Sequence, residues 1–169
     1  MTKSAKPSKE DKKNLEEKLG EVLGLERAAQ KVVDELNSMK LLESGTKKDI
    51  TEIKEAISHE EQIKKLITTL SNENEELKID EDNIEETAKE TEKKASKMMK
   101  TYLGENPDSS EAIEFLAIAE GGEVIHYEVL DAISKNFKIK ELTNTVNSIL
   151  KEEQKHLQIC IDLAKENVS

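Results

Sequence analysis

The sequence predicts an all-α fold, and three observations lead to this class. The chain of 169 residues contains only two Pro and six Gly, whereas architectures with many strands need frequent turns and therefore more of both. Lys, Glu, Leu, Ile and Ala are abundant, and this composition favours helices. In addition, apolar residues recur at alternating spacings of three and four, which is the period of a helix with one buried face.

Two long helices are predicted in the first half of the chain. Residues 1–9 are rich in lysine and are expected to form a flexible tail, while residues 10–169 form one helical domain. The first predicted helix covers Glu10–Leu42 and stops before Gly45, because glycine is a typical C-terminal signal. The second predicted helix covers Asp49–Asn72. The short turn between them predicts an antiparallel pair.

Three more helices are predicted after an acidic, polar connection. The third covers Ile84–Tyr102. The fourth starts at a serine cap, Ser109 or Ser110, and ends near Lys135, and the fifth covers Ile139–Glu166. The last two are again joined by a short turn. Two antiparallel hairpins with a long middle segment predict a four-helix bundle with the additional third helix in the crossover.

Charge and composition exclude several classes of protein. The formal net charge is −11, from 26 Lys and Arg against 37 Asp and Glu, which argues against a nucleic-acid partner because phosphate contacts need clustered cations. Cys160 is the single cysteine and excludes an internal disulfide or a thiolate zinc knuckle. No apolar run approaches the ~18 residues that cross a bilayer. These features predict a soluble, cytoplasmic protein with no membrane partner.

Four of the predicted helices carry charged or histidine residues inside an otherwise apolar stripe. These residues are Glu26 in the first helix, His59 and Glu60 in the second, Glu123 and His126 in the fourth, and Glu153 and His156 in the fifth. A buried carboxylate is costly unless it is neutralised, paired or bound to a metal. The interruptions fall near the middles of their helices, which meet at one height in an antiparallel bundle. We therefore expect them to converge on one metal site in the core.

The chemistry of these residues suits a transition metal. Neutral imidazole together with carboxylate suits iron, manganese or zinc. The Glu-x-x-His spacing places both groups on one helix face, because residues three apart are neighbours. Two other residues near the stripes, Tyr127 and Cys160, are expected to be ordinary packing residues of the core.

These motifs resemble the ferritin-like di-metal carboxylate proteins. The segment AEGGEVIHYE (119–128), followed by KEEQKH (151–156), is most similar to the YciE/YciF-type bacterial stress proteins and also to rubrerythrin-type domains. The resemblance implies a di-iron or manganese cofactor without a nucleotide or organic cofactor. It also implies possible ferroxidase or peroxidase chemistry on O₂ or peroxide in a stress response. The long polar middle segment and the low aromatic content favour a monomer or homodimer over a large cage.

The resemblance assigns ligand positions to named residues. Glu26 matches the carboxylate of the first helix, Glu123 that of the third bundle helix, and Glu153 and His156 the pair in the last helix. The second helix departs from the family pattern, because His59 stands in place of a Glu and Gln62 in place of a His; Glu60 or Glu55 are candidates for the missing carboxylate. In the fourth helix Ile125 replaces a Glu, which Glu123 or Glu128 would compensate.

Two alternatives to a di-metal enzyme stay open at this point. The departures in the second and fourth helices fit a non-catalytic stress or scaffold protein that keeps the fold with a degenerate or absent metal site. A plain interaction bundle would instead use its buried Glu and His in hydrogen-bonded networks, which can fix helix register at a cost in stability.

Overall fold

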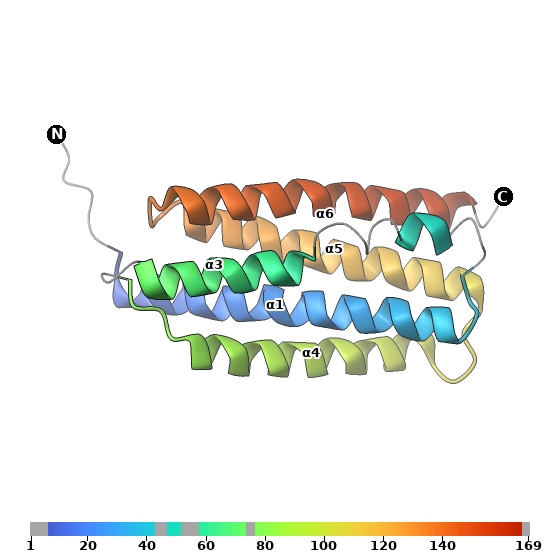
Figure 1. The fold of residues 1–169 in the computed structure, drawn as a ribbon. Helices are drawn as coiled ribbons and strands as arrows, with labels where there is room; N and C mark the ends of the chain where they lie inside the picture. The colour runs from blue at the N-terminus through green and yellow to red at the C-terminus, as the bar shows by residue number, and fades with distance from the viewer. Residues whose placement is uncertain (1–6, 43–46, 52–57, 74–76, 167–169) are drawn as a thin grey trace.

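Five long helices make up most of the chain in the computed structural model (Figure 1). The model describes residues 7–42, 47–51, 58–73 and 77–166. The helices are α1 (Lys9–Ser38), α3 (His59–Glu73), α4 (Glu81–Leu103), α5 (Ser109–Ser134) and α6 (Lys140–Glu166). Within those described ranges there is no strand, so the all-α prediction is confirmed. No helix in the described part of the chain is long and apolar enough to cross a membrane.

Short polar side chains fix where several helices begin. Ser8 caps α1, and Asp11 bonds back to the Ser8 backbone, which satisfies two amides that the helix leaves free. Asp108 and Glu111 form the same reciprocal pair at the start of α5. The cap of α5 is therefore Asp108, and the predicted serine cap was one or two residues late. Aspartate accepts the amide bond as well as serine does.

The predicted second helix is the element that differs most from the structure. Residues 47–51 are helical, but α3 begins only at His59, after Ser58, whose carbonyl accepts bonds from the first amides of the helix. Residues 52–57 lie outside the described part. His59 is consequently the first residue of α3, and its expected position in the middle of one continuous helix is wrong. The first helix also ends earlier than predicted, at Ser38.

Four helices surround a common interior, and a fifth covers its outer side (Figure 1). α1 and α6 run in one direction, while α3 and α5 run in the other, so within this group of four each helix lies antiparallel to the ones it contacts. α4 returns the chain along the length of the molecule and packs beside α1. In the order of the chain, α4 thus lies between α3 and α5.

The apolar core is divided into two clusters. One contains Leu15, Leu19 and Ile149 near the start of α1, and the other contains Leu36, Leu116 and Cys160 near its end. α1, α5 and α6 each contribute residues to both clusters. Along each of these helices, the buried carboxyl groups described below come after the residues of one cluster and before those of the other. The bundle interior therefore changes from apolar to polar and back along its axis.

Two glycines allow α4 to approach α1 closely. A Cβ atom on Gly24 would lie 2.4 Å from the carbonyl oxygen of Ala88, and one on Gly20 would lie 2.6 Å from Cβ of Thr87. Backbone atoms cannot move aside as a flexible side chain can, so only glycine fits at this spacing. The crossover helix is thus held against α1 by backbone proximity as well as by apolar burial.

We expect Gly24→Ala to lower the free energy of unfolding by about 1–2 kcal/mol in urea denaturation. Overpacking costs about 1–3 kcal/mol, which outweighs the gain of about 1 kcal/mol from the higher helix propensity of alanine. Gly121→Ala is the matched control, because its Cβ would meet only Leu157 Cδ1, at 3.8 Å. That variant should be equally or more stable than the wild type. Equal stabilities of the two variants would contradict the close α1–α4 contact.

Candidate metal centre

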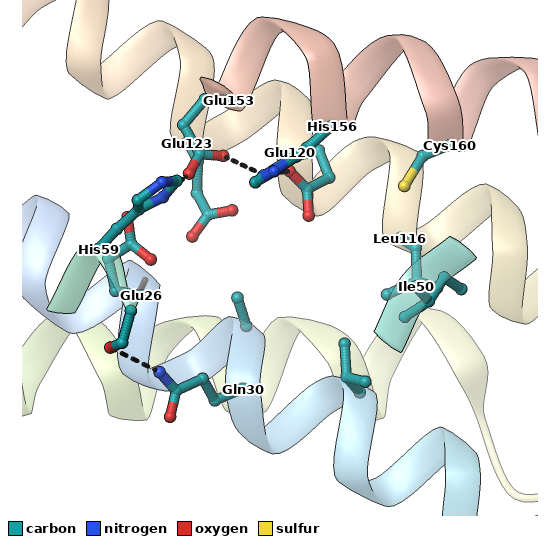
Figure 2. Close-up of a pocket in the computed structure, with 13 residues that line it drawn as sticks. Glu26, Gln30, Ile50, His59, Leu116, Glu120, Glu123, Glu153, His156 and Cys160 are labelled. Carbon is teal, nitrogen blue, oxygen red and sulfur yellow. Dashed lines mark hydrogen bonds and ion pairs between the residues drawn. The ribbon is translucent and has the colours of Figure 1, made fainter. Parts of the chain in front are cut away.

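Six ionisable side chains from four helices meet in the middle of the bundle (Figure 2). They are Glu26 from α1, His59 from α3, Glu120 and Glu123 from α5, and Glu153 and His156 from α6. Glu153 is only 2% exposed and Glu123 only 4%. Such burial of carboxyl groups requires compensation by cations, hydrogen bonds or a metal.

His59 is the main protein cation that faces these carboxyl groups. Its Nδ1 contacts Glu153 and lies 3.5 Å from Oε1 of Glu26. Its Nε2 lies 2.9 Å from Oε2 of Glu152, a half-exposed residue at the edge of the cluster. The imidazole also stacks on that of His156, with 5.6 Å between the ring centroids. One ring thus links α3 to both α1 and α6.

The pKa values of His59 and Glu153 reflect this contact. Burial alone would lower the pKa of His59, but the carboxylates of Glu153 and Glu26 outweigh it and raise the pKa to about 11. Burial would raise the pKa of Glu153, yet the adjacent imidazoles of His156 and His59 bring it down to about 2. In the metal-free protein this pair is accordingly ionised, as imidazolium and carboxylate, at neutral pH.

The remaining carboxyl groups are poorly compensated. Burial, followed by the charge of Glu153, raises the pKa of Glu120 to about 9. Burial, followed by the charge of Glu26, raises the pKa of Glu123 well above its ordinary value. Buried oxygens of Glu120, Glu123 and Glu153 have no hydrogen-bond partner. An unsatisfied buried acceptor is expensive and is a reason to look for an ion.

Tyr127 orients Glu26. Its hydroxyl donates a hydrogen bond of 2.7 Å to Oε1 of Glu26, and the tyrosine is fully buried. Burial, and then the neighbouring charge of Glu26, raises the pKa of the phenol well above its ordinary value, so it stays a donor. Tyr127 was expected to serve only in packing, whereas it also positions a carboxylate of the centre.

The side chains form two groups that could each hold a metal ion. His59, Glu153 and His156 make one group, and Glu120, Glu123 and Glu153 make the other. Within each group, the potential ligand atoms lie within 4.8 Å of one another. Glu153 belongs to both groups. Histidine nitrogen and carboxylate oxygen are ligands of iron, manganese and zinc, whereas calcium and magnesium prefer oxygen alone.

A cavity of about 60 Å³ adjoins the six side chains. Figure 2 shows the carboxyl groups and histidines at one end, with Leu116, Ile50 and Cys160 at the other. Burial raises the pKa of the Cys160 thiol to about 12, so it is neutral, in agreement with the inert core thiol that was expected. This volume has room for ordered water molecules beside the side chains.

The structure brings together five of the seven residues predicted as metal ligands: Glu26, His59, Glu123, Glu153 and His156. It does not bring Glu60 and His126 to this cavity.

Glu60 is turned towards cations outside the centre. It bonds to Arg27, at 3.1 Å, and contacts Lys64. Burial would raise its pKa, but these two cations prevail and lower it. Of the other candidates in the second helix, Glu55 lies outside the described residues, and Gln62 does not line the cavity.

His126 is turned away from the centre as well. Its Nδ1 lies 2.8 Å from the carbonyl oxygen of Gly122, and its Nε2 lies 3.8 Å from Glu21. Glu128, proposed to compensate for Ile125, is exposed and accepts a hydrogen bond from Gln154.

Glu120 is the residue that the sequence reasoning missed. The predicted stripe of α5 passed through Ala119, Glu123 and His126, whereas the buried stripe passes through Leu116, Glu123, Tyr127 and Leu130. At spacings of four and three this second stripe includes Glu120 and excludes His126. Tracing the stripe through Tyr127 would have found it.

Comparisons of the chain with protein-family models, curated proteins and solved structures found no match. The interpretation of this site therefore depends on its own geometry and chemistry.

We expect Glu123→Leu to raise the free energy of unfolding of the chelator-treated protein by about 1–3 kcal/mol. Replacing a buried, poorly compensated ionisable group by an apolar one of similar volume is often stabilising by this amount. Glu114→Leu, an exposed substitution on the same helix, should stay within about 0.5 kcal/mol of the wild type. A strongly destabilised Glu123→Leu would mean that the carboxyl group is satisfied in the metal-free protein.

Proposed function

We propose that this protein is a ferritin-like di-metal carboxylate protein that binds two iron or manganese ions in the middle of its bundle. The observation that carries the proposal is the convergence of four carboxyl groups and two histidines with three unsatisfied buried oxygens among them. A buried oxygen without a partner costs stability, and a bound cation is one way to compensate that cost.

The arrangement of the helices supports the ferritin-like assignment. Ferritin-like folds consist of two antiparallel helix pairs with one long crossover, and their metal ligands project inward from facing helices. Here α1 with α3 and α5 with α6 are the pairs, and α4 lies in the crossover (Figure 1). The ligands come from all four bundle helices and none of the six comes from α4.

Each group of three side chains would hold one ion. His59 and His156 would bind the first, Glu120 and Glu123 the second, and the carboxylate of Glu153 would bridge both. Glu26 would complete the set from α1, with Tyr127 fixing its orientation. Because a ligating imidazole is neutral, binding requires His59 to give up its proton and its ion pairs with Glu152 and Glu153.

Iron or manganese bound here would supply one-electron redox chemistry towards O₂ or peroxide, which is consistent with a role in oxidative stress. The chain's own contribution is to hold the ligands and to limit access. The cavity of about 60 Å³ has room for molecules of the size of water, O₂ or peroxide beside the ligands. Cys160 is the single cysteine, so electrons would have to come from another molecule.

A non-catalytic scaffold is the second candidate function, and one observation favours it. His59 already pairs with Glu152 and Glu153, which compensates part of the buried negative charge without a metal. In that case the cluster would be a polar network that fixes the register of α3 against α6.

Metal content distinguishes the two functions. Protein purified after growth with added iron or manganese should contain about two metal ions per chain. His156→Ala should lose at least one of them, whereas His126→Ala should retain both, because that imidazole lies outside the cavity. Elemental analysis of the three proteins measures this. A metal content near zero in the wild type, or the same content in both variants, would overturn the di-metal proposal and favour the scaffold.

Metal should also stabilise the fold. A ligand at 100 times its Kd stabilises the native state by about 2.7 kcal/mol, which for a chain of this length is a Tm increase of roughly 5–10 °C. Mn²⁺ added to the chelated wild type should give such an increase in a thermal melt. Glu120→Gln should reduce it, whereas Glu114→Gln, an exposed change on the same helix, should leave it unchanged. Equal shifts in both variants would show that Glu120 is not a ligand.

A further inference from the structure

The two groups of potential metal ligands differ in their donor atoms. The first group, which we call the histidine position, offers two imidazole nitrogens and one carboxylate, from His59, His156 and Glu153. The second group, the carboxylate position, offers carboxylate oxygens alone, from Glu120, Glu123 and Glu153. Because Glu153 is common to both, the chemical difference between the two positions comes from their other members.

The two histidines lie next to each other. His59 is the first residue of α3 and His156 lies on α6, and their rings stack with 5.6 Å between the centroids and 18° between the planes. Nδ1 of His59 contacts Oε1 of Glu153, and Nδ1 of His156 lies 3.8 Å from Oε2 of the same carboxylate. An ion among these three side chains would therefore have two nitrogen ligands.

On α5, the cavity is lined by carboxylates rather than by a histidine. The ring of His126 is turned away, with its Nδ1 2.8 Å from the carbonyl oxygen of Gly122. Glu120 and Glu123 line the cavity instead, and each has a buried oxygen without a hydrogen-bond partner. An ion held by these oxygens and by Glu153 would have only oxygen ligands from the protein.

We propose that, within the di-metal function proposed above, the two positions select different metals: Fe²⁺ at the histidine position and Mn²⁺ at the carboxylate position. Imidazole suits iron and zinc, whereas carboxylate suits manganese and magnesium. Fe²⁺ generally binds more tightly than Mn²⁺, so selection between them depends on the type of ligand. The advantage of Fe²⁺ is greatest where nitrogen ligands are present, and the histidine position would therefore take Fe²⁺ first. The shared Glu153 would then bridge two unlike ions.

Zn²⁺ and Mn²⁺ added to the chelator-treated protein test this selection without any reaction. Zn²⁺ shares the preference for imidazole and is diamagnetic, so Mn²⁺ alone gives an electron paramagnetic resonance signal. One equivalent of Zn²⁺ followed by one of Mn²⁺ should leave about one of each per chain in elemental analysis after desalting. The Mn²⁺ electron spin echo should show no modulation by histidine nitrogen. Mn²⁺ added alone to Glu123→Gln should show that modulation, because only the histidine position is then intact.

Single substitutions assign each ion to its position. Loss of even an outer-shell partner weakens metal binding about 10–100-fold, so in calorimetry His156→Gln should weaken binding of the first equivalent of Zn²⁺ at least about 10-fold and leave Mn²⁺ binding nearly unchanged. Glu123→Gln should have the reverse effect. Glu123 is a sharper choice than Glu120, whose Oε2 lies 3.9 Å from Nδ1 of His156. His126→Gln and Glu114→Gln, which change residues outside the cavity, are the matched controls and should bind both ions as the wild type does.

The outcomes separate failure of the selection from failure of the di-metal proposal. Nitrogen modulation of the Mn²⁺ echo in the mixed-metal wild type would overturn the selection and leave two metal positions. Equal losses of Zn²⁺ and Mn²⁺ affinity in His156→Gln and Glu123→Gln would do the same. Binding of neither ion by the wild type would overturn both proposals together.

Discussion

The burial of four carboxyl groups between two apolar halves of the core is the constraint on which the rest of the structure depends. A carboxylate in a medium of low dielectric constant is unstable unless it is protonated, paired or bound to a cation. Protonation, pairing and hydrogen bonding are visible here. Glu153 is ionised beside His59, Glu120 and Glu123 have raised pKa values, and Glu26 accepts a bond from Tyr127. His59 compensates only part of this potential negative charge, and the groups around it could hold a metal ion.

The helices were largely predictable because helix periodicity and end signals are local properties of the sequence. Stripes at spacings of three and four located all five long helices, with errors of a few residues at several ends and a start of α3 at Asp49 instead of His59. The break before His59 was not predictable in this way. His59 continues the apolar pattern of the second predicted helix, and no proline or glycine marks the start of α3 at Ser58. The close packing of α4 on α1 depends on Gly20 and Gly24, whose role becomes visible only when the partner helix is known.

The candidate site was predictable where it depends only on which side chains lie on the buried face of a helix. Charged residues inside apolar stripes identified Glu26, Glu123, Glu153 and His156, because burial of such residues is unusual. In α5 two stripes were compatible with the sequence, and the packing of Tyr127 against α1 selects the one that contains Glu120. Glu60 shows a different limit. Arg27 of α1 pairs with it across two helices, and Lys64 pairs with it within α3. The apolar pattern of a single helix does not reveal such ion pairs.

The division of the core into two apolar clusters has a consequence for how the molecule unfolds. Each cluster draws on α1, α5 and α6, but the layer between them consists of groups that repel one another when ionised. The two ends of the bundle are therefore joined through a layer of polar side-chain contacts rather than through a continuous apolar core. Such a molecule can open at one end while the other stays folded, as separate cooperative units do. An ion bound in the middle layer would tie the two units into one, so that occupancy of the centre would determine the cooperativity of the whole chain.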